Sequence, residues 1–160
     1  MSAYVVMGVS GCGKSTVAVA LAERTGGIYL DADDFHPPAN KQKMAAGIPL
    51  TDDDRWGWLD ALNEELRRRP TETVFLACSA LKEIYRERLR TNVPGLRFIY
   101  LKGSREIIAR RLGQRQGHFM PAALLDSQFA TLEEPVDAIV VDIDQPPETM
   151  IADALRALKE

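Results

Sequence analysis

Residues 8–16 of the chain read GVSGCGKST, and this stretch decides the fold. It fits the pattern G-x-x-x-x-G-K-[ST], whose fixed positions are here Gly8, Gly13, Lys14 and Ser15. The glycines of such a loop let backbone N–H groups turn inward around phosphate oxygens. An apolar run, AYVVMGV, precedes the loop and an Ala-rich segment, KSTVAVALAERTGG, follows it. A strand leading through the loop into a helix is the context in which the pattern binds a nucleotide.

The loop also assigns roles to its side chains. The following helix directs unpaired N–H groups and a partial positive charge at the phosphates. Lys14 is expected to reach the β- and γ-phosphates, and the Ser15 hydroxyl to ligate Mg²⁺. We interpret Cys12 as a small spacer rather than a redox thiol. The predicted nucleotide-binding residues are Gly8, Ser10, Gly11, Cys12, Gly13, Lys14, Ser15 and Thr16.

Four more short apolar runs follow the first strand, and helical segments separate them. The runs lie at 28–33, 73–78, 97–103 and 138–144. Helices are expected at about 14–27, 55–68, 81–91, 104–116 and 147–159, with shorter ones near 39–46 and 121–132. Strands that alternate with helices form a parallel sheet covered on both faces. We therefore predict one α/β domain over residues 1–160, with the three-layer fold of P-loop NTPases.

Composition and length exclude several classes of function. The net charge of −3 lacks the basic surplus of nucleic-acid-binding proteins, so we expect no nucleic-acid partner. No apolar run approaches the ~20 residues of a membrane helix, and the N-terminus lacks the features of a secretory signal. Two cysteines without a C-x-x-C spacing fit a reducing cytoplasm. The guanine-reading N-K-x-D is absent, and 160 residues favour a small kinase over a motor or transport ATPase.

The phosphoryl acceptor should lie beyond the carboxyl ends of the strands, where ligands bind in open α/β sheets. The second strand leads into DADDFHPP. Asp31 and Asp33 are two residues apart, so on a strand they would face the same way. We predict that Asp31 supports Mg²⁺ through water and that Asp33 accepts a hydrogen bond from the hydroxyl being phosphorylated.

Basic residues follow the other strands at the same edge. Thr51 and Asp54 have the spacing of a capping box, which places Arg55 in the first helical turn. The helix dipole disfavours a cation there, and a bound anionic ligand would offset this unfavourable interaction. Lys82, Arg86 and Arg90 share one helical face. We expect Lys82 to reach a bound anion, and Arg90 to belong to a solvated stripe paired with glutamates.

The segment SREIIARRLGQRQGHFMP carries several further cations. Arg110, Arg111 and Arg115 crowd one predicted helix, and arginines of a mobile lid commonly neutralise a transferring phosphoryl group. An exposed basic helix is the alternative. His118 is expected either to contact the substrate or to serve local structure. Together these residues suit a small polyol with one anionic group.

The sequence resembles the gluconate kinases, a family of P-loop small-molecule kinases. The stretches that carry the resemblance are GVSGCGKST, DADDFHPPANKQKMAAGIPLTDDDRWGWL, CSALKEIYRERLR and GHFMPAALLDSQFATLEEP. The chain departs from the family pattern at Gly57, where a proline is usual, and at Cys12, where serine or alanine is usual. The resemblance implies a sheet of order 2-3-1-4-5, a helical lid and a homodimer.

The resemblance also implies transfer of the ATP γ-phosphoryl group to the 6-hydroxyl of D-gluconate, giving 6-phosphogluconate and ADP. Carried over residue by residue, the catalytic set is Lys14, Asp33, Arg111 and Arg115. The substrate-binding set is Asp33, His36, Arg55, Lys82, Arg86 and His118.

Two alternatives stay open. A kinase of the same fold could act on another acceptor such as shikimate or adenylylsulfate; shikimate kinases share D-x-D after strand two but have a glycine-rich loop where this chain has CSALK. A nucleotide-binding regulator without turnover is the alternative from another class.

Overall fold

A computed structural model describes residues 2–114 and 122–159. The strands are β1 (Ser2–Met7), β2 (Ile28–Asp31), β3 (Thr73–Ala77), β4 (Arg97–Lys102) and β5 (Ala138–Asp142). The helices are α1 (Lys14–Thr25), α2 (Pro38–Ala45), α3 (Asp52–Arg67), α4 (Glu83–Arg90), α5 (Arg105–Gln114), α6 (Ala122–Thr131) and α7 (Pro147–Leu158), and a 3-10 helix, η1, spans Ala32–Phe35.

The five strands form one parallel sheet of order β2-β3-β1-β4-β5, which confirms the predicted topology. The first strand is central, so Val5 lies beside Leu76 of β3 and Phe98 of β4. All strands are parallel, and their carboxyl ends therefore meet at one edge, where the loops that carry the predicted site residues begin.

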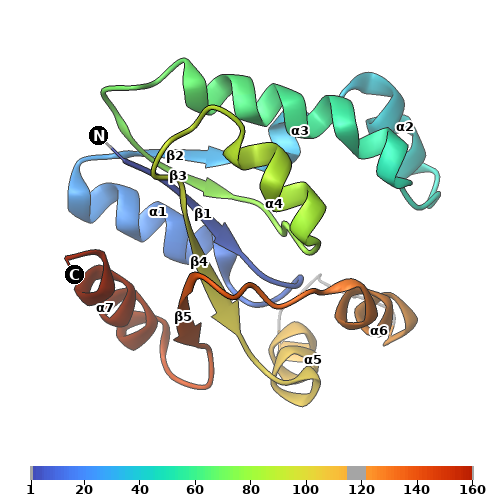
Figure 1. Cartoon of the computed structure of the whole chain (residues 1–160). Helices are drawn as coiled ribbons and strands as arrows, with labels where there is room; N and C mark the ends of the chain where they lie inside the picture. Colours follow the sequence, from blue (N-terminus) through green and yellow to red (C-terminus); the bar gives the residue numbers. More distant parts are fainter. Residues whose placement is uncertain (1, 115–121, 160) are drawn as a thin grey trace.

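Two cores flank the sheet, one on each face. Alternate residues of a strand point to opposite faces, so Val6 packs into one core and Val5 into the other. Helices α1 and α7 cover the Val6 face, and α3 and α4 cover the Val5 face (Figure 1). This is the predicted three-layer arrangement. Among the described residues no helix is long and apolar enough to cross a membrane.

Local sequence signals set most helix boundaries. Gly26 ends α1 in the left-handed conformation, with φ of 73°, which glycine adopts without strain. Thr51 begins α3 with the predicted capping box, in which its hydroxyl accepts from the Asp54 N–H and the Asp54 carboxylate accepts from the Thr51 N–H.

The second strand is shorter than predicted. It ends at Asp31 instead of continuing to Asp33, because the Asp31 carboxylate accepts a hydrogen bond from the Asp33 N–H at 2.9 Å and caps the 3-10 helix η1. The expectation that both carboxylates lie on one strand was therefore wrong, although the turn keeps both beside the same cavity.

Candidate active site

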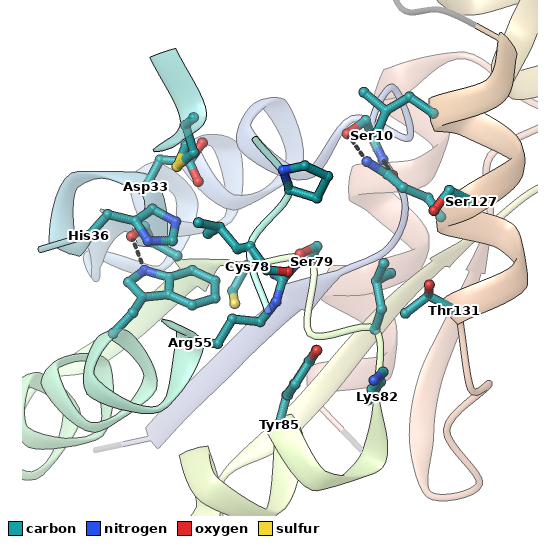
Figure 2. Close-up of a pocket in the computed structure, with 18 of the residues that line it drawn as sticks. Ser10, Asp33, His36, Arg55, Cys78, Ser79, Lys82, Tyr85, Ser127 and Thr131 are labelled. Atoms are coloured by element: carbon teal, nitrogen blue, oxygen red, sulfur yellow. Dashed lines mark hydrogen bonds between the residues drawn. The ribbon is translucent and has the colours of Figure 1, made fainter. Parts of the chain in front are cut away.

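A cavity of about 780 Å³ lies at the carboxyl edge of the sheet, where the phosphate loop, η1, α3, the β3–α4 loop and α6 meet. Figure 2 shows Asp33 and His36 on one side of it and Ser127 and Thr131 on the other. The predicted site residues that line it are Ser10, Lys14, Ser15, Asp31, Asp33, His36, Arg55 and Lys82.

The phosphate loop owes its shape to backbone conformation. Gly8 has φ of 148°, and a Cβ there would meet the Cys12 sulfur at 2.7 Å, so only glycine fits. Gly13 has φ of 99° and forms the N-cap of α1 without any side-chain cap. The first N–H groups of α1 are thus left for a ligand. The Lys14 ammonium donates to the carbonyl oxygens of Gly8 (3.0 Å) and Val9 (3.1 Å).

A side chain from α6 also contacts the loop. Gln128 accepts a hydrogen bond from the Ser10 N–H at 2.7 Å, and its amide nitrogen donates to the Ser10 hydroxyl at 3.0 Å. The two bonds join α6 to the phosphate loop across the cavity. In this structure Ser10 is therefore bonded to the side-chain amide of Gln128. The sequence pattern of the loop alone does not indicate this contact.

The two carboxylates beside the phosphate loop, Asp31 and Asp33, have different surroundings. Burial raises the pKa of the Asp33 carboxyl, and repulsion from Asp31 raises it further. One oxygen of Asp31 is used in capping η1. Asp33 is thus a carboxylate with a raised pKa beside the cavity, and Asp31 is anchored at the start of η1. The roles expected of them, accepting a hydrogen bond from the hydroxyl and supporting Mg²⁺ through water, stay predictions.

His36 is almost fully buried, with 7% of its surface exposed. Its ring stacks on the Trp58 indole with 4.2 Å between centroids and 14° between planes. The indole N–H donates to the Ala32 carbonyl at 2.7 Å, so Trp58 is anchored as well. Trp58 is thus both part of the core and a wall of the cavity.

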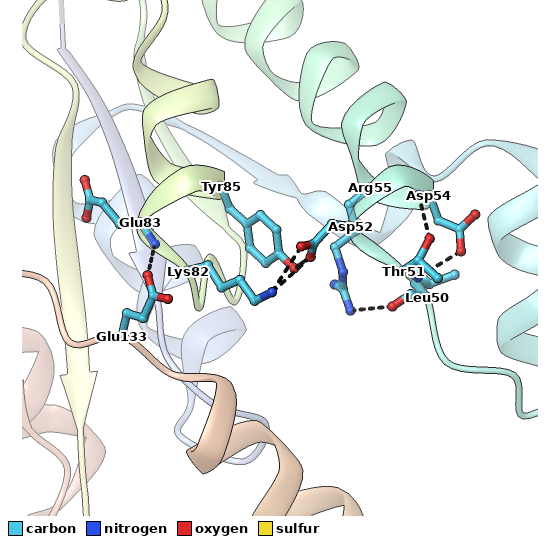
Figure 3. A network of polar contacts seen from close by, with 9 residues as sticks. All are labelled: Leu50, Thr51, Asp52, Asp54, Arg55, Lys82, Glu83, Tyr85 and Glu133. Atoms are coloured by element: carbon cyan, nitrogen blue, oxygen red, sulfur yellow. Dashed lines mark hydrogen bonds and ion pairs between the residues drawn. The ribbon is translucent and has the colours of Figure 1, made fainter.

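Two cations, Arg55 on α3 and Lys82 at the N-cap of α4, face the phosphate loop from the opposite wall. Lys82 is held 3.1 and 3.2 Å from the two carboxylate oxygens of Asp52, and the Tyr85 hydroxyl donates to the same carboxylate at 2.5 Å (Figure 3). These hydrogen bonds lower the pKa of Asp52, and the bond from Tyr85 has the largest effect. Burial and the Asp52 bond together raise the pKa of Tyr85 to about 12.

Arg55 is less well satisfied than Lys82. One of its terminal nitrogens lies 3.5 Å from the Leu50 carbonyl, a weak bond, and the guanidinium lies 5.4 Å from the centre of the Tyr85 ring. Its Nε is buried without a hydrogen-bond partner among the described residues. A buried donor without a partner is costly, so the position favours an anionic or hydroxyl-bearing ligand.

Arg86 does not lie where the sequence analysis expected. It is 1% exposed and does not line the cavity. Its guanidinium donates to the carbonyls of Ala80 and Glu133, both at 2.7 Å, and pairs with Glu83. The side chain of Arg86 therefore contacts backbone carbonyls and not the cavity. We correct the expected role of Arg86 from substrate contact to support of the β3–α4 loop. Arg90 pairs with Glu83, as expected.

Arg111 also departs from its expected place over the transferring phosphoryl group. Its guanidinium donates to the carbonyls of Ile143 and Gln145, which hold it against the β5–α7 connection. There it lines a second cavity of about 450 Å³ with Gly13, Thr16 and Pro146, across the phosphate loop from the first. The backbone carbonyls thus direct Arg111 to this side of the loop. Arg115 and His118 lie outside the described residues.

Sequence reasoning missed four residues that organise the site: Asn40, Asp52, Tyr85 and Gln128. Tyr85 lies one helical turn after Lys82, a spacing that could have marked it, whereas the Asp52–Lys82 and Ser10–Gln128 contacts join elements 30 and 118 residues apart. Cys12 behaves as the predicted spacer, since its side chain is fully buried in the core.

The chain is similar to several characterised proteins. Residues 4–135 match a family described as an AAA domain. The thermoresistant gluconokinase of Escherichia coli K12 is 47% identical over 163 residues, covering 98% of this chain and 93% of the relative. A gluconokinase of Gluconobacter oxydans is 46% identical, covering 95% and 88%.

Solved structures agree with these relatives. A gluconokinase from Sinorhizobium meliloti superposes with a TM-score of 0.92 at 49% identity, covering 99% of this chain and 91% of that one. Shikimate kinase from Aquifex aeolicus superposes with a TM-score of 0.64 at 16% identity, a similarity of fold alone.

Proposed function

The chain belongs to the gluconokinase family, and we propose that it transfers the ATP γ-phosphoryl group to the 6-hydroxyl of D-gluconate, giving 6-phosphogluconate and ADP. The observation that carries the proposal is the cavity itself. A phosphate-binding loop forms one wall, and the opposite wall presents Arg55, whose Nε is buried without a hydrogen-bond partner in the part of the chain that the structure describes. This arrangement suits an acceptor with a hydroxyl at one end and an anionic group at the other.

On the donor side, phosphate oxygens would take the N–H groups at the start of α1 and the Lys14 ammonium. Lys14 would exchange its bonds to the Gly8 and Val9 carbonyls for bonds to phosphate. Charge on the equatorial oxygens in the transition state is then met by a fixed cation and by backbone dipoles.

The nucleoside would lie in the second cavity. Gly13 and Thr16 of the phosphate loop line that cavity, whereas Lys14 and Ser15 line the first one. A nucleotide that follows the loop would therefore place its base near Arg111 and Pro146 and its γ-phosphate in the larger cavity. Arg111 is then proposed to contact the nucleotide, and Arg115 remains proposed as a lid cation.

On the acceptor side, Asp33 would orient the hydroxyl and take its proton. Its pKa is raised by burial, which makes it a better base than an ordinary aspartate. Arg55 and Lys82 would bind the carboxylate or hydroxyls of the sugar acid, and His36 and His118 would contact hydroxyls. Positioning supplies most of the rate in such a loose transition state.

The residues present also fit Mg²⁺. Among the described residues no cluster of three or more His, Cys, Asp or Glu could hold a metal alone. Mg²⁺ bound to a nucleotide needs few protein ligands, because phosphates and waters supply the rest. Ser15 and, through water, Asp31 would hold it, both oxygen donors on the same cavity. Bound there, Mg²⁺ would neutralise phosphate charge.

We propose that residues 1–160 form one kinase domain that dimerises; the edge strand β5 with Val140 57% exposed is a surface that a second copy would cover. A cytoplasmic location is supported by Cys12 and Cys78, which are buried free thiols.

The experiment is a coupled ADP-release assay with D-gluconate, related sugar acids, shikimate, or no acceptor. We expect ADP release that depends on D-gluconate. Release with shikimate alone would identify another acceptor on the same fold. Nucleotide binding without any acceptor-dependent release would identify a regulator and overturn the proposal.

A further inference from the structure

The ring of His36 is fixed in place by its neighbours. Trp58 stacks on one face, and His36 itself is 7% exposed. With the plane fixed, the chemistry that His36 offers to the cavity depends on which ring nitrogen carries the proton. The two ring nitrogens differ in what they contact, and that difference is set by Asn40.

Asn40 lies in the first turn of α2 and is 3% exposed. Its side-chain nitrogen is 2.8 Å from the Asp54 carbonyl oxygen and 3.2 Å from His36 Nδ1. A carbonyl oxygen can only accept, so the amide group facing it must be the NH₂. The second hydrogen of that NH₂ is then available to His36 Nδ1, which must accept it.

A histidine whose Nδ1 accepts, and which is neutral, carries its proton on Nε2. The surroundings keep the ring neutral. Burial lowers the pKa of His36; Asp33 on η1 opposes this, and Arg55 on α3 and Lys41 on α2 add to it. Nε2–H is thus the ring donor left to the cavity that His36 lines.

We propose that Asn40 is a positioning residue that locks His36 in the Nε2–H tautomer, so that His36 donates to the acceptor hydroxyl while Asp33 receives that hydroxyl's proton. A hydroxyl has one proton and two lone pairs. With the opposite tautomer, His36 and Asp33 would compete for the same proton. The identity of the hydroxyl rests on the proposed function, whereas the tautomer does not.

The direct test is a long-range ¹H–¹⁵N correlation spectrum of the labelled full chain at neutral pH. The chain has two histidines, His36 and His118, and a His36→Gln variant assigns the signals. We expect a pyridine-type shift for Nδ1 of His36 and a pyrrole-type shift for Nε2. A protonated Nδ1 in the native chain would overturn the inference.

Two variants of Asn40 and one control complete the test. Asn40→Asp places a carboxylate at the same position, which draws the proton to Nδ1; Asn40→Ala leaves the tautomer mixed. Lys43→Ala is the matched control, because Lys43 contacts the Asp54 carboxylate at 2.8 Å and not its carbonyl. Its His36 signals should equal those of the native chain. Circular dichroism and thermal unfolding verify that each variant folds.

Kinetics connect the tautomer to the reaction. For both Asn40 variants we expect kcat/KM for the acceptor to fall about 10-fold, with KM for ATP changed less than about 2-fold. Native tautomer signals and native kinetics in folded Asn40→Ala would overturn the inference. Absence of gluconate phosphorylation in the native chain, with Nδ1 unprotonated, would overturn the proposed function and leave the Asn40 assignment standing.

Discussion

The phosphate loop and the facing wall of the cavity are built by different means. The loop is shaped by backbone, with glycines at positive φ and a helix N-terminus that carries no side-chain cap. The wall is built from side chains that depend on other elements: Lys82 is held by Asp52 of α3, and the Tyr85 hydroxyl donates to the same carboxylate. Backbone geometry needs only a short motif, whereas a wall of this kind depends on distant partners.

This difference separates two kinds of mutational effect. In the loop, a side chain acts directly on the ligand, so its loss should reduce the rate and leave the fold intact. In the wall, the partner of a ligand-binding residue matters as much as that residue. The following four variants test this separation, from the largest expected effect to the smallest.

Lys14→Ala should reduce kcat by about 10²–10³-fold, because the ammonium would meet charge that grows in the transition state. Circular dichroism should be unchanged, since Lys14 bonds only to its own loop among the described residues. Near-normal turnover of the folded variant would remove the loop lysine from the mechanism.

Arg86→Met should lower the free energy of unfolding by about 2–3 kcal/mol, because it leaves the buried Ala80 carbonyl, and the Glu133 carbonyl, without their donor. Arg90→Met, four residues on and 36% exposed, is the control, with an expected cost below about 1 kcal/mol. Urea denaturation measures both, and equal losses would contradict the structural role of Arg86.

Arg55→Ala should raise KM for gluconate about 10-fold, and KM for ATP by less than about 2-fold, since it removes an interaction with the acceptor alone. Arg88→Ala is the matched control, because Arg88 pairs with the exposed Asp60 on the outer surface. A similar rise in both KM values for Arg55→Ala would place this arginine on the nucleotide instead.

Asp52→Asn should lower stability slightly at neutral pH. Hydrogen bonds lower the pKa of Asp52 in the folded state. The carboxylate therefore stabilises the fold at pH values above its ordinary pKa of 3.8, and this stabilisation is lost as the pH falls through the lowered pKa. The difference between native chain and variant should therefore vanish in acid. Unfolding curves across this range measure it, and a pH-independent difference would contradict the assignment.

The sequence predicts the fold well because its signals are local. The loop pattern, the glycine stop after α1 and the capping box of α3 each depend on a few neighbouring residues. Strands that alternate with helices imply a parallel sheet, and the strand order followed from the family resemblance. The end of β2 was missed because the residues IYLDAD fit two structures equally well. Asp31 could continue the strand, or its side chain could cap a turn that ends the strand.

The site was less predictable because its decisive contacts are distant. A spacing of four places Arg86 and Lys82 on one face of α4, but it does not say that Arg86 would meet the carbonyl of Glu133, 47 residues later. Asn40 and Asp54 are likewise brought together only when α2 folds against α3. These contacts depend on tertiary packing, which no local pattern encodes.

The central place of β1 has a consequence for the order of events during synthesis. β1 leaves the ribosome before the other four strands of the sheet, yet its two neighbours are β3, complete at residue 77, and β4, complete at residue 102. At about 5–20 residues per second, β1 waits some 5–20 s for its second partner. Through that interval its apolar residues depend on α1, which follows at once, and on chaperones. The strand that leads into the phosphate loop is thus made before its neighbours and enclosed late.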